Sequence, residues 1–356
     1  MLAEIVQKGF FEPALGLAEA GRRVRLRCAR LATLTPLSAA EARGFLVGYD
    51  EPELLGVVPV PAGTVNSSYA LLLAGRRRFL RIYEEQDAAG AASEAALLAH
   101  LATRGVPTPG PLPRKDGGFV GVLLGKPCVL FPWRDGTMRC LAGVTPEDAR
   151  RVGHALAEVH VAGEGARLPA SRFRPEDLTL RLERIAAFHV RAIAELAPPL
   201  SSKLRDVAAS RNPALPQGLV HGDLFRDNVL WSGDGNLSAL LDFESASHGT
   251  LAFDLMVTVL AWCFTGGFDG ARARAMTAGY EQVRRLTPAE RAALAIEGAF
   301  AALRFTITRI TDDAMRAARL GVPPRRDKDW RRFATRLHAL EALGSEGILD
   351  LLGLAP

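Results

Sequence analysis

The sequence is poor in cysteine and has no apolar run long enough to cross a membrane. Its four cysteines, Cys28, Cys128, Cys140 and Cys263, include no pair with metal-ligand spacing. We expect them to be buried free thiols of a reducing compartment, which predicts a cytoplasmic location. The apolar run at 255–268 is shorter than the about 20 residues that a membrane-spanning helix needs, so we expect no membrane contact.

Positive charge exceeds negative charge only slightly. The chain has 44 Lys and Arg against 39 Asp and Glu, a net charge of +5, and only five of the basic residues are lysines. Short arginine clusters are scattered at 22–23, 76–78 and 331–332, whereas nucleic-acid-binding proteins concentrate basic residues on one face. We therefore expect solvated surface and no nucleic-acid partner, with a mild preference for anionic ligands.

The first 34 residues differ in pattern from the remainder. Glu4, Lys8 and Glu12 interrupt the apolar core that a signal peptide needs. Residues 21–34 alternate basic and apolar side chains. We expect residues 1–34 to form an N-terminal extension that the fold does not require.

The remaining chain divides into a strand-rich and a helix-rich part. Residues 35–131 predict a helix capped by Thr35 or Ser38, then five strands with one main helix after the third. From residue 132 on helices dominate, and two short strands flank the turn at 232–236. The longer helices of this part are predicted at 145–163, 175–196, 253–264, 271–283, 287–310 and 329–343.

Polar residues gather in the short irregular stretch "HGDLFRDN" at 221–228. One interpretation is a surface turn, since turns are rich in Asp, Asn and Gly. The other is a catalytic loop. The stretch opens a predicted hairpin whose second strand ends at Asp242, so pairing of the strands would bring Asp223, Asn228 and Asp242 together at one edge.

These three side chains suit phosphoryl transfer to an alcohol. Asp223 would orient the acceptor hydroxyl and take its proton, while Asn228 and Asp242 would supply two of the hard oxygen ligands that Mg²⁺ prefers. Positioning and charge neutralisation would then do most of the catalysis. His221 would brace the loop, because the carboxylate already fills the role of the base.

"HGDLFRDN" and the later "LLDFESA" resemble motifs of the aminoglycoside phosphotransferase and choline kinase superfamily, over about residues 35–340. The resemblance implies an α+β, bilobal protein-kinase-like fold. A small N-terminal lobe at 35–131 would hold a five-stranded antiparallel sheet with one main helix and bind nucleotide. A larger, mainly helical C-terminal lobe at 132–356 would carry the catalytic loop and substrate site. ATP and Mg²⁺ would be the cofactors, and a small molecule the acceptor.

Further stretches resemble the kinase-like homoserine kinases of that superfamily, among them "AGTVNSSYAL", "GHALAEVHVAGEG", "FDLMVTVLAWCF" and "AALRFTITR". This resemblance implies phosphorylation of L-homoserine on the route to threonine. Two alternatives stay open. The first is another small-alcohol kinase of the superfamily, acting on an amino alcohol, a sugar or an aminoglycoside. The second is a pseudokinase that binds nucleotide without turnover. The segment after Asp242 departs from the family, because it carries Glu244, Ser245, His248 and Gly249 in place of aromatic and Asn-Asp residues.

The resemblance also implies a nucleotide site in a cleft between the lobes. Its implied contacts are Gly63, Thr64, Ser67, Arg81, Glu94 and Phe131. The loop at 62–69 would cover the phosphates, and the segment around Phe131 would be the hinge. Kinases generally place a lysine on the third strand, where this chain has Arg81, a side chain that can hold phosphate oxygens in a fork with Glu94 to orient it. The alternatives are an ordinary polar loop and a solvent-facing arginine.

A homoserine acceptor is a zwitterion, so its site needs a cation for the carboxylate and an acid for the ammonium group. Arg304 and Arg309, on the helix predicted at 287–310, could hold the carboxylate through two parallel hydrogen bonds. Asp227 and Glu244 lie close in sequence to the catalytic residues and could receive the ammonium group. Alternatively, the two arginines could tie helices together through carboxylates.

Overall fold

The computed structural model describes residues 35–60 and 65–354, so the expected extension at 1–34 lies outside it. The described residues form two compact units. The first comprises the residues up to Ala92 together with Pro111–Thr137, and the second comprises Ser93–Gly110 and the residues from Met138 on. No helix among the described residues is long and apolar enough to span a membrane.

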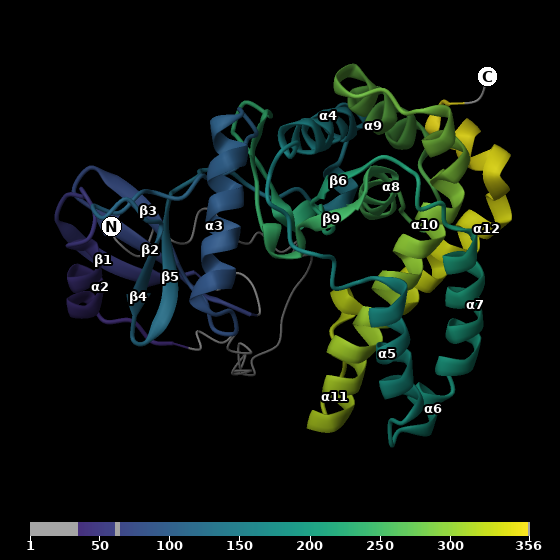
Figure 1. The fold of residues 1–356 in the computed structure, drawn as a ribbon, viewed down its shortest axis with the longest axis horizontal. Helices are drawn as coiled ribbons and strands as arrows, with labels where there is room; N and C mark the ends of the chain where they lie inside the picture. The colour runs from purple at the N-terminus through teal and green to yellow at the C-terminus, as the bar shows by residue number, and fades with distance from the viewer. Residues whose placement is uncertain (1–34, 61–64, 355–356) are drawn as a thin grey trace, which may run out of the picture. The chain divides into compact units, whose positions relative to one another are not determined.

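An antiparallel five-stranded sheet forms most of the first unit (Figure 1). Its strands are β1 (Leu54–Pro59), β2 (Ser67–Leu73), β3 (Arg76–Ile82), β4 (Val120–Leu123) and β5 (Lys126–Pro132), in the order β1-β2-β3-β5-β4. The predicted five strands are confirmed. The third strand begins at Arg76, because Gly75 takes a left-handed φ of 80° and closes a short turn before it.

Alternation along β3 places its apolar residues in the core of this unit. Leu80 and Ile82 are fully buried and pack in one cluster with Phe45 of helix α2 (Ala39–Leu46). Helix α2 begins at Ser38, one of the two predicted caps, whose side chain accepts the N–H of Glu41 in a reciprocal capping box. The helix expected after the third strand is α3 (Ala88–Thr103).

Helices make up most of the second unit (Figure 1). They are α4 (Pro146–Ala162), α5 (Pro175–Ala186), α6 (Arg191–Ala194), α7 (Ala197–Ser210), α8 (Leu251–Trp262), α9 (Gly270–Val283), α10 (Pro288–Arg309), α11 (Met315–Leu320) and α12 (Arg331–Leu352). The prediction of a single helix at 175–196 is wrong. The chain forms two helices there, α5 and α6, and between them Phe188 is buried and Val190 takes an extended conformation.

Two short strand pairs carry the central loop of this unit. β7 (Val229–Trp231) and β8 (Leu237–Leu240) form the predicted hairpin, with Val229 opposite Leu240. β6 (Gln217–Val220) and β9 (Ser247–Thr250) form a second antiparallel pair that the sequence did not predict. The polar stretch at 221–228 therefore starts at the end of one strand pair and finishes at the start of the other.

Helices α4 and α9 pack backbone against backbone through two glycines. A Cβ at Gly153 would lie 2.0 Å from the carbonyl oxygen of Met276, and a Cβ at Gly279 would lie 2.0 Å from that of Arg150. No side chain fits at either contact. These glycines set how closely α9 approaches α4, the helix that also carries His160 of the site described below.

The expectation of buried thiols is correct for two cysteines and wrong for a third. Cys128 and Cys263 are buried, whereas Cys140 is exposed. Cys140 lies outside any strand or helix, just before the short turn Leu141–Gly143, which explains its exposure. Burial raises the pKa of the Cys128 thiol to about 12. Cys28 lies outside the described residues.

Candidate active site

The hairpin closes the polar loop in the way its sequence predicted. The Leu241 N–H donates to the Asn228 carbonyl at 2.8 Å, so the residue before Asp242 is bonded directly to the end of the loop. Asn228 Nδ2 donates in turn to the Asp223 carbonyl at 2.8 Å. Main-chain and side-chain bonds therefore hold Asp223, Asn228 and the start of Asp242 at one edge of the hairpin.

The side chain of Asn228 is oriented by that bond. Its amide nitrogen is used as the donor to Asp223, and the residue is 9% exposed. An amide held by its nitrogen presents its oxygen, Oδ1, as an acceptor. Asn228 is thus arranged as an oxygen ligand for a cation.

Asp242 carries both backbone strain and an unpaired oxygen. Its φ of 61° and ψ of 68° are left-handed, a conformation uncommon for a residue other than glycine. Its Oδ1 is buried and has no hydrogen-bond partner among the described residues. A buried, unpaired carboxylate oxygen is costly, and a cation next to it would remove that cost.

The donor set fits a divalent cation that keeps water ligands. Among the described residues, no group of three or more His, Cys, Asp or Glu could hold a metal ion by itself. One carboxylate and one amide oxygen, from Asp242 and Asn228, are instead the partial, all-oxygen set typical of Mg²⁺ sites that also use water and substrate phosphates.

Asp223 is partly buried and hard to ionise. Its side chain is 31% exposed. Burial, together with the charge of Asp242, raises the pKa of the Asp223 carboxyl to about 6, although Arg304 and Lys328 act in the opposite direction. A carboxylate with a pKa near neutrality is well suited to accept a proton from an alcohol during catalysis.

Arg304 of α10 lies beside Asp223. Its Nη1 is 3.9 Å from Asp223 Oδ1, and its side chain is 5% exposed. The guanidinium carbon lies 3.9 Å from the ring centroid of Phe173 and 3.8 Å from that of Phe305. Burial lowers the pKa of Arg304 to about 10, so the group stays charged at neutral pH. Two aromatic rings therefore hold a cation next to the reactive carboxylate.

His221 braces the loop, as its sequence position predicted. The imidazole is fully buried, and its Nε2–H donates to the Leu241 carbonyl at 3.0 Å. Its Nδ1 accepts the N–H of Asp223 at 3.3 Å. Both ring nitrogens are thus engaged with the backbone on the two sides of the site.

Asp254 of α8 is a second support, which the sequence analysis missed. Its carboxylate accepts the N–H groups of His221 at 2.6 Å and of Gly222 at 2.8 Å. The buried ring of His160 donates to the same carboxylate at 3.0 Å. The available signal was a lone acid inside the otherwise apolar helix "FDLMVTVLAW", since a buried charge needs partners.

The residues expected to contact nucleotide phosphates are only partly described. Gly63 and Thr64 lie outside the described residues. The Ser67 hydroxyl accepts the N–H of Thr35 at 3.0 Å and donates to Glu84. Because its one hydrogen goes to Glu84, Ser67 is not free to donate to a phosphate, and we leave it out of the nucleotide contacts proposed below.

The other expected nucleotide residues lie on regular elements. Arg81 is partly buried on β3, opposite Val129. Phe131 is buried on β5, opposite Phe79 of β3. Glu94 is buried on α3 and belongs to the second unit. Their roles toward a nucleotide stay predictions.

The four residues expected to recognise the acceptor do not share one wall. Arg304 lies beside Asp223. Arg309 and Asp227 line a separate cavity of about 330 Å³. Glu244 lies on the short turn Phe243–Ser245 that follows Asp242. Of the two arginines, only Arg304 has a side-chain nitrogen within 4.0 Å of the Asp223 carboxylate.

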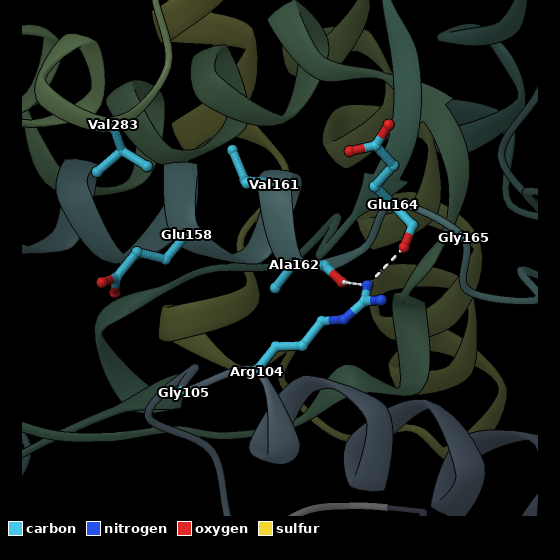
Figure 2. Close-up of a pocket in the computed structure, with 8 residues that line it drawn as sticks. All are labelled: Arg104, Gly105, Glu158, Val161, Ala162, Glu164, Gly165 and Val283. Atoms are coloured by element: carbon cyan, nitrogen blue, oxygen red, sulfur yellow. Dashed lines mark hydrogen bonds between the residues drawn. The ribbon is translucent and has the colours of Figure 1, made fainter.

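A larger cavity, of about 480 Å³, lies elsewhere in the second unit. Figure 2 shows Arg104 pointing into it, with its Nη1 donating to the carbonyls of Ala162 at 3.0 Å and Glu164 at 2.6 Å. Those carbonyls satisfy the guanidinium, and Asp223 does not line this cavity. The residues that the sequence predicted for catalysis therefore lie at the hairpin edge and not in this larger cavity.

The comparison with known proteins agrees with this geometry. A sequence model of the phosphotransferase enzyme family matches residues 56–286, a range that includes Asp223, Asn228 and Asp242. The chain belongs to that family. It is an ATP-dependent phosphotransferase, and the family resemblance seen in the sequence is confirmed.

Several relatives with a curated name are homoserine kinases. That of Rhizobium etli is 35% identical over 290 residues, which are 79% of this chain and 88% of the relative. That of Rhizobium rhizogenes is 36% identical over 290 residues, again 79% of this chain and 88% of the relative. These matches extend well beyond the catalytic motifs.

Solved structures confirm the predicted α+β kinase-like fold. The amicoumacin kinase hAmiN, in complex with AMP-PNP, Ca²⁺ and Ami, has a TM-score of 0.62 at 15% identity and covers 87% of this chain and 95% of its own. The choline kinase LicA of Streptococcus pneumoniae has a TM-score of 0.56 at 15% identity, covering 82% and 94%. The five-stranded sheet and the mainly helical second unit belong to this fold.

Proposed function

We propose that the enzyme transfers the γ-phosphoryl group of ATP to the hydroxyl of L-homoserine and yields O-phospho-L-homoserine, in the cytoplasm, on the route to threonine. The observation that carries this proposal is the identity of 35% over 290 residues with a homoserine kinase. The alcohol acceptor agrees with the chemistry of the hairpin edge, where a carboxylate with a pKa near neutrality lies beside an oxygen ligand set.

In this proposal Asp223 orients the acceptor hydroxyl and accepts its proton. Asn228, through Oδ1, and Asp242 hold Mg²⁺, which when bound neutralises charge on the nucleotide phosphates. His221 and Asp254 act as positioning residues, because they hold the backbone at residues 221–223 through buried hydrogen bonds.

The nucleotide contacts that we propose come from Gly63, Thr64, Arg81, Glu94 and Phe131. Arg81 stands where kinases generally have a lysine, and a guanidinium can bind two phosphate oxygens at once. Glu94 would orient it, and the backbone around Phe131 would receive the adenine. Arg81→Lys should then keep more turnover than Arg81→Ala in an ADP-release assay, because lysine retains the positive charge.

We propose Arg304 as the residue that reads the carboxylate of homoserine. Homoserine is short, so a carboxylate receptor has to lie close to the base that activates its hydroxyl, and Arg304 Nη1 is 3.9 Å from Asp223 Oδ1. Glu244, two residues after Asp242, is the acid that we propose for the ammonium group, and Asp227 is the alternative acid.

A steady-state assay of ADP release tests the substrate. The acceptors are homoserine, choline, 1-amino-2-propanol, kanamycin and glucose, each at saturating MgATP. We expect kcat/KM for homoserine to exceed every other value by at least about 100-fold, as expected when buried polar groups read the substrate. The second candidate is a kinase of another amino alcohol, which the unusual residues at 244–249 favour. A higher kcat/KM for choline or aminopropanol would select it and overturn homoserine.

A further inference from the structure

Basic side chains crowd the cavity of about 330 Å³ in the second unit. Six basic residues line it against two acids, Asp227 and Asp327. One of the six, Arg139, is neutralised by Asp148. The other five are Arg226, Arg309, Lys328, Arg332 and Arg336.

The four arginines of this set bind backbone carbonyls and not carboxylates. The contacts are Arg226 Nη1 to Ala261 at 2.5 Å, Arg336 Nε to Leu260 at 2.8 Å, Arg332 Nη1 to Asp327 at 3.1 Å and Arg309 Nη1 to Asp329 at 3.3 Å. Within the described ranges, none of the four has a carboxylate oxygen within 4.0 Å of its nitrogens. The carbonyls orient the guanidinium groups but leave their charge unbalanced.

The cavity therefore holds like charges that repel one another. Burial, with the charges of Arg332 and Arg309, lowers the pKa of Arg336 to about 9, and burial together with Arg332 lowers the pKa of Arg309 to about 10. Both groups remain charged at neutral pH. Uncompensated buried charge destabilises a fold, so an anion in this cavity would relieve the repulsion.

The size and chemistry of the cavity select a small, doubly charged ligand. A volume of about 330 Å³ suits a metabolite and excludes a polymer. Guanidinium forks bind phosphate oxygens through paired, charge-assisted hydrogen bonds. Set against Asp227 and Asp327, the five cations leave an excess of three positive charges, of which a monocarboxylate would balance only one. We propose that this cavity binds a phosphomonoester or phosphate dianion through Arg309, Arg332 and Arg336.

The wall of this anion cavity does not include Asp223 or Arg304, although Phe225, Arg226 and Asp227 of the polar loop contribute to it. Stacked groups link the cavity to Arg304: Arg304 lies over Phe305, Phe305 stacks on Phe333 with centroids 4.7 Å apart, and Arg309 lies 4.5 Å from the Phe333 centroid.

Calorimetry on the full chain tests the proposal, with EDTA present and no nucleotide, at constant ionic strength. Inorganic phosphate and O-phosphoserine are the probes, and serine is the blank. We expect saturable binding of at least one phosphate probe with a Kd below about 1 mM. Tighter binding of O-phosphoserine would indicate that Asp227 or Asp327 receives its ammonium group, and equal affinities would indicate inorganic phosphate. No saturable binding of either probe overturns the proposal.

Two neighbouring arginines provide the matched variants. Arg332→Gln removes a lining charge and should weaken phosphate binding at least tenfold. Arg331→Gln removes an exposed charge that pairs with Asp329 at 3.4 Å and does not line the cavity, so its binding should match the wild type. Equal affinity in both variants would contradict the site.

The reactivity of Cys140 shows where the anion binds, independently of its affinity. It lines the same cavity and is exposed. In a Cys28→Ser background, phosphate should slow the reaction of Cys140 with the anionic disulfide reagent DTNB, and Arg332→Gln should abolish this protection. Binding that leaves the labelling rate unchanged would place the anion elsewhere and overturn the assignment. Because no acceptor is present, failure here is separate from failure of the homoserine proposal.

Discussion

At the scale of single residues, the site is built from side chains held in unfavourable states. Asp242 combines a left-handed backbone with a buried oxygen that has no partner among the described residues. Asp223 has a raised pKa, and Arg304 is a buried cation between two rings. Each of these costs stability in the unliganded protein and would be compensated by a ligand.

Asp223→Asn should lose turnover and gain stability in alkaline solution. Removal of a general base lowers kcat by about 10²–10⁴-fold. The ordinary pKa of 3.8 is raised to about 6 in the folded protein, so the native state binds the proton more tightly than the unfolded chain does. Ionisation therefore destabilises the native state, and this cost is fully present above about pH 6. Asn removes it, so the gain in melting temperature should be larger at pH 8 than at pH 5.

Calorimetric melting in EDTA measures that difference, and the ADP-release assay measures turnover. An equal shift of melting temperature at both pH values would contradict the raised pKa. Turnover within threefold of the wild type would instead reject Asp223 as the base.

Asp242→Asn should weaken binding of MgATP while leaving the backbone unchanged, since Asn tolerates the left-handed conformation. The reason is loss of the charged ligand whose Oδ1 has no partner among the described residues. Asp234→Asn, in the turn of the same hairpin, is the control and should bind MgATP normally. Titration calorimetry measures the MgATP affinity of both variants. Unchanged affinity in Asp242→Asn would exclude a role as a charged metal ligand.

Arg304→Lys should raise the KM for homoserine about tenfold, equivalent to about 1.4 kcal/mol, because lysine cannot reproduce the paired hydrogen bonds of a guanidinium. The KM for ATP should change little. Arg309→Lys is the comparison and should alter the KM for homoserine less than threefold, since Arg309 lies on the anion cavity. If Arg304→Lys changed the KM for homoserine and the KM for ATP equally, the role of Arg304 would be structural.

At the scale of elements, the sequence predicted what depends on local pattern. The hairpin followed from its turn residues and the strands on either side, and it brought Asp223, Asn228 and Asp242 together. The pair β6 and β9 escaped prediction because each strand is short and its partner is distant in sequence. Asp254 escaped for a related reason: its partners, His160 and the 221–222 backbone, are distant in sequence.

The contact between α4 and α9 gives a test at this scale. Gly153→Ala should destabilise the protein by about 1–3 kcal/mol, as overpacking does, because the new Cβ would lie 2.0 Å from the Met276 carbonyl oxygen. Gly44→Ala in α2 is the control: its Cβ would meet nothing within 4 Å, so helix propensity should stabilise it by a few tenths of a kcal/mol or more. Thermal melting should show a lower melting temperature for Gly153→Ala and a higher one for Gly44→Ala. A stabilising effect of Gly153→Ala would refute the close contact.

At the scale of the whole molecule, the matched family motifs and the arginines that we propose as anion ligands lie in different parts of the chain. The family match ends at residue 286, after the catalytic loop and Asp242. Helices α10 and α12, which carry Arg304, Arg309, Arg332 and Arg336, follow it. The sequence could therefore predict phosphoryl transfer from motifs, whereas separating Arg304 from Arg309 required the packing of α10, which places Arg304 beside Asp223 and Arg309 in the wall of the cavity.

A competition assay tests the central claim most directly. Equimolar homoserine, choline, 1-amino-2-propanol and kanamycin are incubated with the enzyme and MgATP, and mass spectrometry identifies the phosphorylated product. We predict that O-phosphohomoserine accounts for nearly all of it and that Asp223→Asn forms none above background. Phosphorylation of another acceptor, or release of ADP with no phosphorylated alcohol, would contradict the assignment.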